Sequence, residues 1–276
     1  MDAAWTTALG AVQGLTEYLP ISSSGHLAAA TLAAPCLGLD QADTAPPMLL
    51  GVLLHAATLA AVLVYFRRAA WEAIRGLGRS VAALARGKLG EAIESDDGAR
   101  LAVAICAGTI PTAAIGLALE RPTTGVSESP LALGLCFLAC AAVLAATRWW
   151  PGGARRLDWR AALVIGLVQG IAVLPGVSRS GATIAAGLAL GLPREEAVRY
   201  SFLLSVPAIA GAALLELDAS AIAGGGGGAA LGAGCAAAFA VGLASLALLR
   251  RIVRGGRLWL FAPYVAAVGV VLLFAA

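Results

Sequence analysis

The sequence predicts an all-α integral membrane protein: an inverted-topology repeat with six spanning helices and two re-entrant helix pairs. Its 276 residues are 60% hydrophobic and only 13% charged, whereas soluble domains carry roughly 25% charged residues. Two of its apolar regions are interrupted by polar stretches that resemble each other. Lysine and arginine are concentrated in alternate connections between the apolar segments. These three observations together indicate a helical membrane domain with an internal repeat.

Six apolar segments are candidates to span a bilayer, which takes about 20 mostly apolar residues. They are residues 47–66, 101–119, 131–147, 201–217, 229–249 and 258–276.

Two further apolar regions, residues 4–34 and 161–192, are broken midway by polar residues. The first island, as we call it, is residues 13–26 (QGLTEYLPISSSGH), and the second island is residues 169–183 (QGIAVLPGVSRSGAT). Interrupted segments at corresponding positions of two halves are typical of a binding site at a repeat interface. We expect each region to form a re-entrant pair, although a full hairpin would fit the charge pattern equally well.

An offset of 156 residues aligns the two islands, pairing Gln13 with Gln169 and Gly25 with Gly181. The charged groups are divided between the copies, because Glu17 stands in the first island and Arg179 in the second. A site that needs both must therefore be assembled from both halves.

Seventeen of the nineteen basic residues lie in four stretches, residues 67–100, 148–160, 194–199 and 250–257. Basic residues favour the cytoplasmic side, so we place these stretches there and both termini outside. The opposite connections carry acids and almost no base; we expect loops at residues 40–46, 120–130 and 216–228. The stretch 67–100 is expected to form one or two amphipathic helices along the cytoplasmic membrane surface.

The chain divides into a first repeat, residues 1–150, and a second repeat, residues 156–276, within one membrane domain, 1–276. Each repeat holds one broken pair and three spanning helices. An odd number of crossings turns the second repeat upside down relative to the first. The two islands then approach from opposite faces and meet near the bilayer midplane.

Glu17 and Arg179 are the two charged residues within the islands. An ionised side chain at the bilayer centre costs about 2.5–3.5 kcal/mol even on the lenient insertion scale, so each is a candidate functional residue. The structural alternative is an ion pair that locks the halves together. A helix is predicted to begin after each island, with serines at the N-cap positions. Two helix N-termini and a guanidinium suit phosphate oxygens.

The remaining polar groups suggest acid–base chemistry. His26 is a candidate acid, base or nucleophile, although a hydrogen bond to a neighbouring helix is an alternative role. Ser23 aligns with Arg179 and is a candidate nucleophile, activated by His26 or Glu17. Glu17 is also the candidate ligand for a hard divalent cation. His55 could face the same cavity, but we expect it to serve packing. The set favours phosphoryl transfer on a lipid phosphate.

Other chemistries find less support in the sequence. Five cysteines form no ligand pattern and are expected to be buried apolar residues. The net charge of +3 arises from separate connections rather than from one basic face, which gives no indication of nucleic-acid binding.

The two islands resemble the signature stretches of the bacterial undecaprenyl-diphosphatase family, also known for bacitracin resistance. The resemblance rests on QGLTEYLPISSSGHL and LPGVSRSGATIAAGL, and it continues through PREEAVRYSFLLSVPAIAGA and VYFRR. It implies hydrolysis of undecaprenyl diphosphate to undecaprenyl phosphate and inorganic phosphate, which recycles the lipid carrier for peptidoglycan synthesis. It also implies the bacterial plasma (inner) membrane, with the active site open to the outer face.

By the same resemblance, Glu17, Ser23, His26 and Arg179 are the expected catalytic residues, with Ser23 or His26 as nucleophile. A divalent cation, Mg²⁺ or Ca²⁺, is implied, with Glu17 as its expected ligand. Some relatives have glutamate where this chain has Gln13, which leaves a two-carboxylate metal site in doubt. Helix starts and resemblance together give the expected substrate-binding residues: Gln13, Ser22, Ser24, Gly25, Ser178, Ser180, Gly181 and Thr183.

Two other functions are alternatives to this interpretation of the sequence. Type 2 phosphatidic-acid phosphatases place a histidine after their Ser-Arg pair, but position 185 here is Ala185 and no later histidine exists. A secondary transporter or polyprenyl-phosphate flippase would use the same midplane site. The expected partners are the polyprenyl diphosphate substrate and membrane lipids, without nucleic acid; a homodimer is left open.

Overall fold

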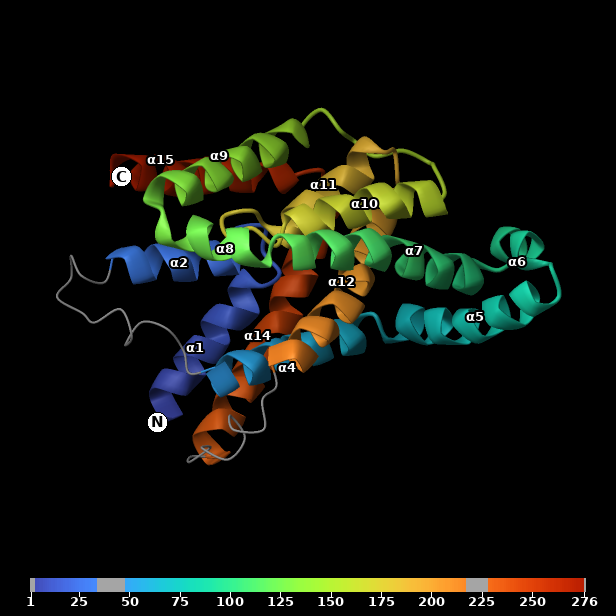
Figure 1. Ribbon diagram of the computed structural model, residues 1–276, viewed down its shortest axis with the longest axis horizontal. Coiled ribbons are helices and arrows are strands. Elements are labelled where there is room, and N and C mark those ends of the chain that lie inside the picture. Colours follow the sequence, from blue (N-terminus) through green and yellow to red (C-terminus); the bar gives the residue numbers. More distant parts are fainter. Residues whose placement is uncertain (1–2, 34–47, 217–227, 276) are drawn as a thin grey trace.

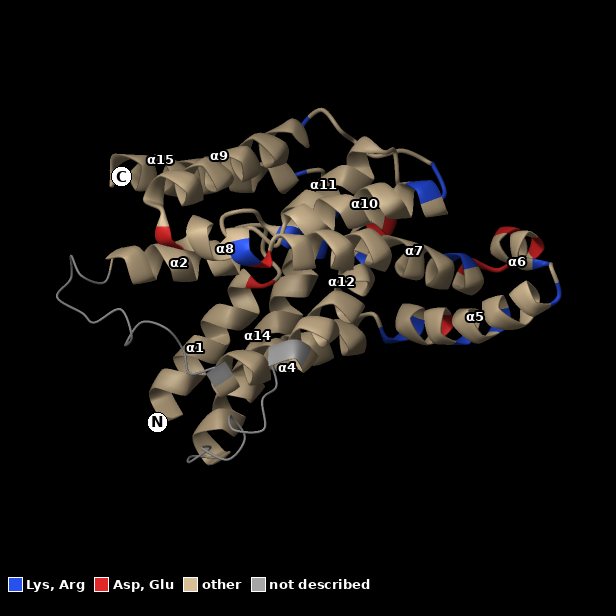
Figure 2. Ribbon diagram, viewed as in Figure 1, with Lys and Arg blue, Asp and Glu red and all other residues tan. Residues whose placement is uncertain are grey.

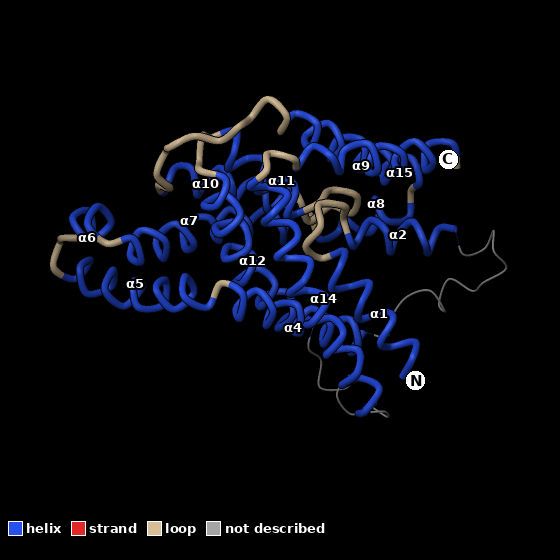
Figure 3. The backbone as a smooth tube through the Cα atoms, turned by 180° about the vertical axis from the view of Figure 1, so that it is seen from behind, coloured by secondary structure: helices blue, strands red, loops and turns tan. Residues whose placement is uncertain are grey.

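The computed structural model describes residues 3–33, 48–216 and 228–275, and within this part of the chain every regular element is a helix (Figures 1 and 3). The elements are α1 (Ala3–Thr16), α2 (Ser23–Ala33), α4 (Met48–Tyr65), α5 (Arg67–Ala85), α6 (Leu89–Ser95), α7 (Asp97–Ala118), α8 (Glu120–Glu128), α9 (Pro130–Ala146), α10 (Trp159–Ile171), α11 (Arg179–Ala189), α12 (Arg194–Glu216), α14 (Gly228–Arg254), the 3₁₀ turn η2 (Leu258–Phe261) and α15 (Ala262–Phe274).

Each of the six apolar segments expected to span coincides with a helix, namely α4, α7, α9, α12, α14 and α15. In the described residues, three helices are by themselves long and apolar enough to cross a membrane, α7, α12 and α14, and the number reaches five if each of two bent pairs forms one span. An all-helical protein with three to five candidate spans is therefore what the structure supports.

Both broken regions form two helices separated by an island. The first island separates α1 from α2, and the second separates α10 from α11. The predicted interruptions are thus present at the expected places. The loop expected at 40–46 lies outside the described residues. So does the loop expected at 216–228, except that Glu216 ends α12 and Gly228 begins α14.

The connector expected at 67–100 consists of α5 and α6, and α5 bends away from α4 by 86° (Figure 1). Charged residues gather here and at the nearby starts of α7 and α10 (Figure 2). The carboxylate of Asp96 caps α7 by accepting hydrogen bonds from the backbone N–H groups of Gly98 and Ala99, at 2.8 and 3.1 Å. Hydrogen bonding to Arg79 holds the pKa of this carboxyl below its usual range. These bonds fix where the connector ends and the apolar helix begins.

The expectation of a loop at 120–130 is wrong, because residues 120–128 form α8. The chain turns between α8 and α9 by 107°. Ser129 caps α9, its hydroxyl accepting a hydrogen bond from the backbone N–H of Ala132 at 3.3 Å, and Pro130 occupies the first turn of that helix. Polar and charged residues dominate α8, so the helix cannot be recognised from apolar length. It stays exposed on one face.

Helices of the two halves pack in a reciprocal way. Helix α1 lies along α14, and α10 lies along α7. Both contacts rely on glycine: a Cβ at Gly10 would lie 2.0 Å from the carbonyl oxygen of Gly234, and one at Gly166 would lie 2.1 Å from that of Gly108. Gly10 and Gly166 are equivalent under the 156-residue offset, so equivalent helices pack through equivalent positions. Small residues allow such close approach of helix backbones in membranes.

The largest buried side chains surround the place where the islands meet. Tyr18 and Phe202 pack edge to face with ring centroids 5.6 Å apart. Phe137 of α9 is fully buried, with its ring against Gly25 of the first island. The Tyr18 hydroxyl donates to the backbone carbonyl of Thr58 in α4. Aromatic packing therefore holds the first island rigidly against α4, α9 and α12.

Candidate active site

The first island leaves α1 and turns sharply into α2. The turn ends at Ser22, whose φ of 67° lies in the left-handed region. Such a φ is uncommon for a residue with a side chain and marks a constrained turn. The Ser22 hydroxyl accepts a hydrogen bond from the backbone N–H of Gly25 at 3.3 Å, and so caps α2. Ser22 thus fills the N-cap role that the sequence allowed for it.

The second island repeats this arrangement. Its turn contains Gly176 at a φ of 89°, a conformation that glycine adopts without strain. Ser178 then caps α11 by accepting a hydrogen bond from the backbone N–H of Gly181 at 3.2 Å. The Ser178 and Ser180 hydroxyls lie 3.2 Å apart. Ser22 and Ser178, which are equivalent under the offset, therefore perform the same local task.

The two islands touch directly. The backbone N–H of Gly176 donates to the Ser22 hydroxyl at 3.1 Å. A Cβ at Gly25 would lie 2.5 Å from the backbone nitrogen of Gly176 and 2.7 Å from the Phe137 ring. The close contact requires that Gly25 have no side chain, and it brings the N-terminal ends of α2 and α11 together.

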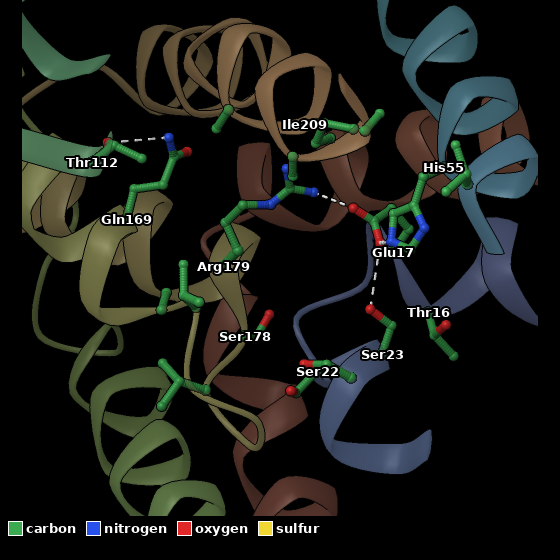
Figure 4. A pocket seen from close by; sticks show the side chains of 18 residues that line it. Thr16, Glu17, Ser22, Ser23, His55, Thr112, Gln169, Ser178, Arg179 and Ile209 are labelled. Atoms are coloured by element: carbon green, nitrogen blue, oxygen red, sulfur yellow. Dashed lines mark hydrogen bonds and ion pairs between the residues drawn. The ribbon is translucent and has the colours of Figure 1, made fainter. Parts of the chain in front are cut away.

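Glu17 and Arg179 meet across this junction (Figure 4). An Nη2–H of Arg179 donates to Oε1 of Glu17, and the two side chains are 19% and 6% exposed. The other carboxylate oxygen, Oε2, accepts hydrogen bonds from Gln13 Nε2 at 3.2 Å and from Ser23 Oγ at 3.3 Å. His55 Nε2 lies 3.8 Å from the same oxygen. The structure thus brings the charged residues of the two islands into contact.

A cavity of about 240 Å³ opens beside this pair. Its polar lining comes from α4, α7 and both islands, and its apolar lining comes mainly from α12 and the second island. The polar lining residues are Thr16, Glu17, Ser22, Ser23, Ser24, His55, Thr112, Gln169, Ser178 and Arg179. The cavity therefore presents both polar and apolar lining.

His26 lies close to the cavity without lining it. Its Nδ1 is 2.8 Å from the carbonyl oxygen of Ser22, and its Nε2 is 2.7 Å from the hydroxyl of Tyr264 in α15. The ring stacks on Tyr264 and meets Phe137 edge to face. Because a carbonyl only accepts hydrogen bonds, Nδ1 carries the proton and Nε2 accepts from Tyr264 when the imidazole is neutral.

Five other expected residues do not line the cavity. Gln13 contacts Glu17 as described, and Gly25 and Gly181 provide backbone at the two helix starts. Thr183 is buried, where its hydroxyl lies 2.5 Å from that of Ser201 in α12. Ser180 contacts Ser178 and likewise does not line the cavity.

Four polar residues that line the cavity are not among the expected site residues: Thr16, His55, Thr112 and Gln169. Packing is the expected role of His55, with a place at the cavity as its alternative, and its ring faces Glu17 (Figure 4). Gln169 was noted only for its alignment with Gln13, yet it lines the cavity while 2% exposed. The available signal was chemical: each is a polar side chain in an otherwise apolar helix, where burying it is costly.

The oxygen donors around Glu17 suit a hard cation in kind, since carboxylate, amide and hydroxyl oxygens are the ligands that Mg²⁺ and Ca²⁺ take. However, one carboxylate oxygen already accepts from Arg179. Among the described residues there is no group of three or more His, Cys, Asp and Glu side chains that could hold a metal ion. The donors therefore fit a cation only if phosphate oxygens of a bound ligand complete its coordination.

Comparison with known proteins gives a consistent result. The family model described as bacitracin resistance protein BacA matches residues 6–271. A protein named undecaprenyl-diphosphatase from Desulfatibacillum aliphaticivorans is 45% identical, with 97% of this chain and 96% of that protein covered. Proteins of the same name from Korarchaeum cryptofilum and Methanosphaera stadtmanae are 42% and 37% identical, over 99% and 95% of this chain and 99% and 94% of their own. With nearly its whole length matched, including both islands and the helices around the cavity, the chain belongs to the bacitracin resistance protein BacA family.

Proposed function

We propose that this protein hydrolyses undecaprenyl diphosphate to undecaprenyl phosphate and inorganic phosphate. The observation that carries the proposal is the meeting of Arg179 with Glu17 and Ser23 at a cavity flanked by two helix N-termini. Such a site provides donors for phosphate oxygens and a carboxylate beside a hydroxyl nucleophile. The names of the relatives support a phosphatase over the transporter or flippase that the architecture alone would allow.

Arg179 binds the terminal phosphate in this proposal. Only one of its five N–H donors is assigned to Glu17, so the guanidinium can hold phosphate oxygens as well. The N-terminal ends of α2 and α11 add positive dipole ends at the same place. Together they stabilise the charge that develops on the phosphoryl group during transfer.

Two groups remain candidates for the nucleophile. Ser23 is supported by its hydrogen bond to Glu17, which would take the hydroxyl proton as Oγ bonds to phosphorus. The bridging oxygen keeps the electron pair, undecaprenyl phosphate leaves, and water then cleaves the phosphoserine. His26 is the alternative; its Nε2 would have to turn from Tyr264 toward the cavity.

A divalent cation, Mg²⁺ or Ca²⁺, is proposed to accompany the diphosphate. Glu17 would be its carboxylate ligand, with phosphate oxygens completing the coordination. When bound, the cation would neutralise charge on the phosphate oxygens.

The membrane arrangement is proposed to be the inverted repeat, with residues 1–150 and 156–276 as its halves and six spans in all. The regions 4–34 and 161–192 would be its re-entrant pairs. Reciprocal packing of α1 on α14 and of α10 on α7 supports this arrangement. The protein would lie in the plasma membrane, with the cavity open to the outer face.

The decisive experiment measures orthophosphate release from a long-chain polyprenyl diphosphate by the detergent-purified protein, with and without a chelator. Arg179→Ala should lower turnover by about 10²–10³-fold, and His26→Ala is measured beside it. Arg121→Ala, a change at an exposed arginine of α8, is the matched control and should leave release unchanged. Undiminished release from Arg179→Ala would refute the proposed site. A well-folded wild type that binds substrate but releases no phosphate would favour the transporter.

A further inference from the structure

Gln169 has a hydrogen-bonding group that no described residue satisfies. The side chain stands near the end of α10, is 2% exposed and lines the cavity. Its Oε1 is buried and has no hydrogen-bond partner. A buried acceptor left without a donor is destabilising. Such an atom in a cavity wall indicates that a ligand or water supplies the donor.

The orientation of the Gln169 amide is fixed by its neighbours. Nε2 donates to the backbone carbonyl of Leu204 at 3.3 Å and to Oγ1 of Thr112 at 3.3 Å. A rotated amide would place Oε1 against the Leu204 carbonyl oxygen, and two acceptors repel each other. The hydroxyl proton of Thr112 is already shared between the carbonyls of Gly108 and Gly166. Thr112 can therefore only accept from Gln169.

Figure 4 shows the amide nitrogen turned toward Thr112 and the oxygen on the other side of the amide, in a residue that lines the cavity. A fully ionised phosphate has no proton to offer this oxygen and would be repelled by it. A water molecule offers two hydrogens and fits a hydrolytic site. In phosphoryl transfer, a glutamine side chain is one of the groups that orient an attacking water.

We propose that Gln169 positions the water that hydrolyses the phosphoryl group. One hydrogen of the water is held by Oε1, which turns a lone pair of the water oxygen toward phosphorus. The new bond joins the water oxygen to phosphorus. The bond from phosphorus to the leaving oxygen breaks, and that oxygen takes the electron pair and the second proton of the water. The leaving oxygen is the bridging oxygen of the diphosphate or Oγ of a phosphorylated Ser23. Gln169 neither gains nor loses a proton.

The inference rests on the proposed phosphatase function, and competition between water and methanol tests it separately. Methanol has a single hydroxyl hydrogen, and this hydrogen must move to the leaving oxygen. Attack by methanol therefore leaves no hydrogen for Gln169 to hold. The detergent-purified protein is given a long-chain polyprenyl diphosphate with added methanol, and both orthophosphate and methyl phosphate are measured. Gln169→Leu removes the acceptor while roughly preserving volume. Thr112→Val removes the neighbouring anchor but keeps Oε1.

For Gln169→Leu we expect kcat for orthophosphate to fall by about 10²-fold, as for a misplaced reactant, with KM near the wild-type value. The ratio of methyl phosphate to orthophosphate should rise. Thr112→Val should leave this ratio unchanged. An equal fall of both products in Gln169→Leu overturns the inference. If the wild type makes no methyl phosphate, the test rests on kcat for orthophosphate release. Equal falls of this kcat in Gln169→Leu and Thr112→Val would then assign Gln169 a purely structural role. Absence of any release from the wild type would instead refute the proposed function.

Discussion

The single negative charge of Glu17 is shared among four side chains from three parts of the chain. Arg179 uses one carboxylate oxygen, while Gln13 and Ser23 share the other and His55 lies nearby. An ionised carboxylate this deeply buried is tolerated only with such partners. Ser23 donates its hydroxyl hydrogen to this carboxylate, so the charge of Glu17 is central to the proposed chemistry.

Removing that charge without changing shape should isolate its contribution. Glu17→Gln is expected to lower turnover by about 10²–10⁴-fold, the usual range for a lost general base, while Arg179 remains free to bind phosphate. Orthophosphate release and substrate KM are measured together. Glu128→Gln, at an exposed position on α8, is the matched control. Turnover equal to that of the wild type would exclude Glu17 as the base.

At the scale of single residues, the sequence was informative about which residue types meet at the site. It was less informative about where their side chains point. Glu17, Ser23 and Arg179 were expected together because a charged residue in an apolar segment requires a partner. The expected role of His26 follows from its place in the first island, and the expected packing role of His55 follows from its place in an apolar helix. Which way each ring points depends on helix phase and on neighbours such as Tyr264, which is 238 residues away from His26. No local pattern carries that information.

Helices α1 and α10 occupy equivalent positions under the 156-residue offset. Each packs closely through a glycine on a helix from the other half of the sequence, α1 on α14 and α10 on α7. Gly10 faces Gly234, and Gly166 faces Gly108. Each crossing also has a threonine hydrogen bond to a backbone carbonyl: Thr6 to Ala230 in the first, and Thr112 to Gly166 in the second, both at 2.9 Å. These crossings hold each broken pair in place and thereby position its island.

A side chain at either crossing should force the helices apart. Gly10→Ala and Gly166→Ala are each expected to destabilise the protein by about 1–3 kcal/mol, the usual cost of overpacking. The measurement is thermal unfolding in detergent. Gly51→Ala in α4 is the control, because a Cβ there would meet nothing within 4 Å. If the three variants unfold at the same temperature, the close crossings do not contribute to stability.

The positions of the helices could be predicted from sequence, but their partners could not. Apolar length located α4, α7, α9, α12, α14 and α15, and the Pro- and Gly-containing islands located the breaks. Helix α8 was missed because its sequence is polar. The pairing of α1 with α14 depends on Gly10 meeting Gly234, and the segment between them in the chain contains many equally apolar candidates.

Charge is distributed unevenly over the whole molecule. Figure 2 shows it around α5, α6 and the starts of α7 and α10, whereas α4 and α9 are almost free of it. Arg156, just before α10, pairs with Asp97 of α7 at 3.1 Å. Arg250 of α14 pairs with Glu195 of α12 at 2.8 Å. Exposed pairs of this kind add little stability individually. The basic residues in these pairs matter more for the proposed orientation of the protein in the membrane, because basic connections favour the cytoplasmic side.

The proposed orientation can be tested with single cysteines in a background whose five cysteines are replaced by alanine. Lys88→Cys, between α5 and α6, should react with a membrane-impermeant thiol reagent only after the cells are permeabilised. Thr124→Cys, on α8, should react in intact cells. Arg257→Cys provides a second cytoplasmic position and should behave as Lys88→Cys does. Labelling of positions 88 and 124 from the same side would contradict the inverted repeat.

The reciprocal crossings also determine the order in which the molecule can be completed during synthesis. Thr6 bonds to Ala230, 224 residues later, and Glu17 pairs with Arg179, 162 residues later. At about 5–20 residues per second, α1 would wait roughly 10–45 s for its partner to leave the ribosome. Glu17 would wait a shorter time, about 8–32 s at the same rate, before Arg179 is synthesised, and until then its carboxylate lacks its arginine partner. Nascent chains shorter than about 180 residues should therefore depend on the insertion machinery to shelter the first island.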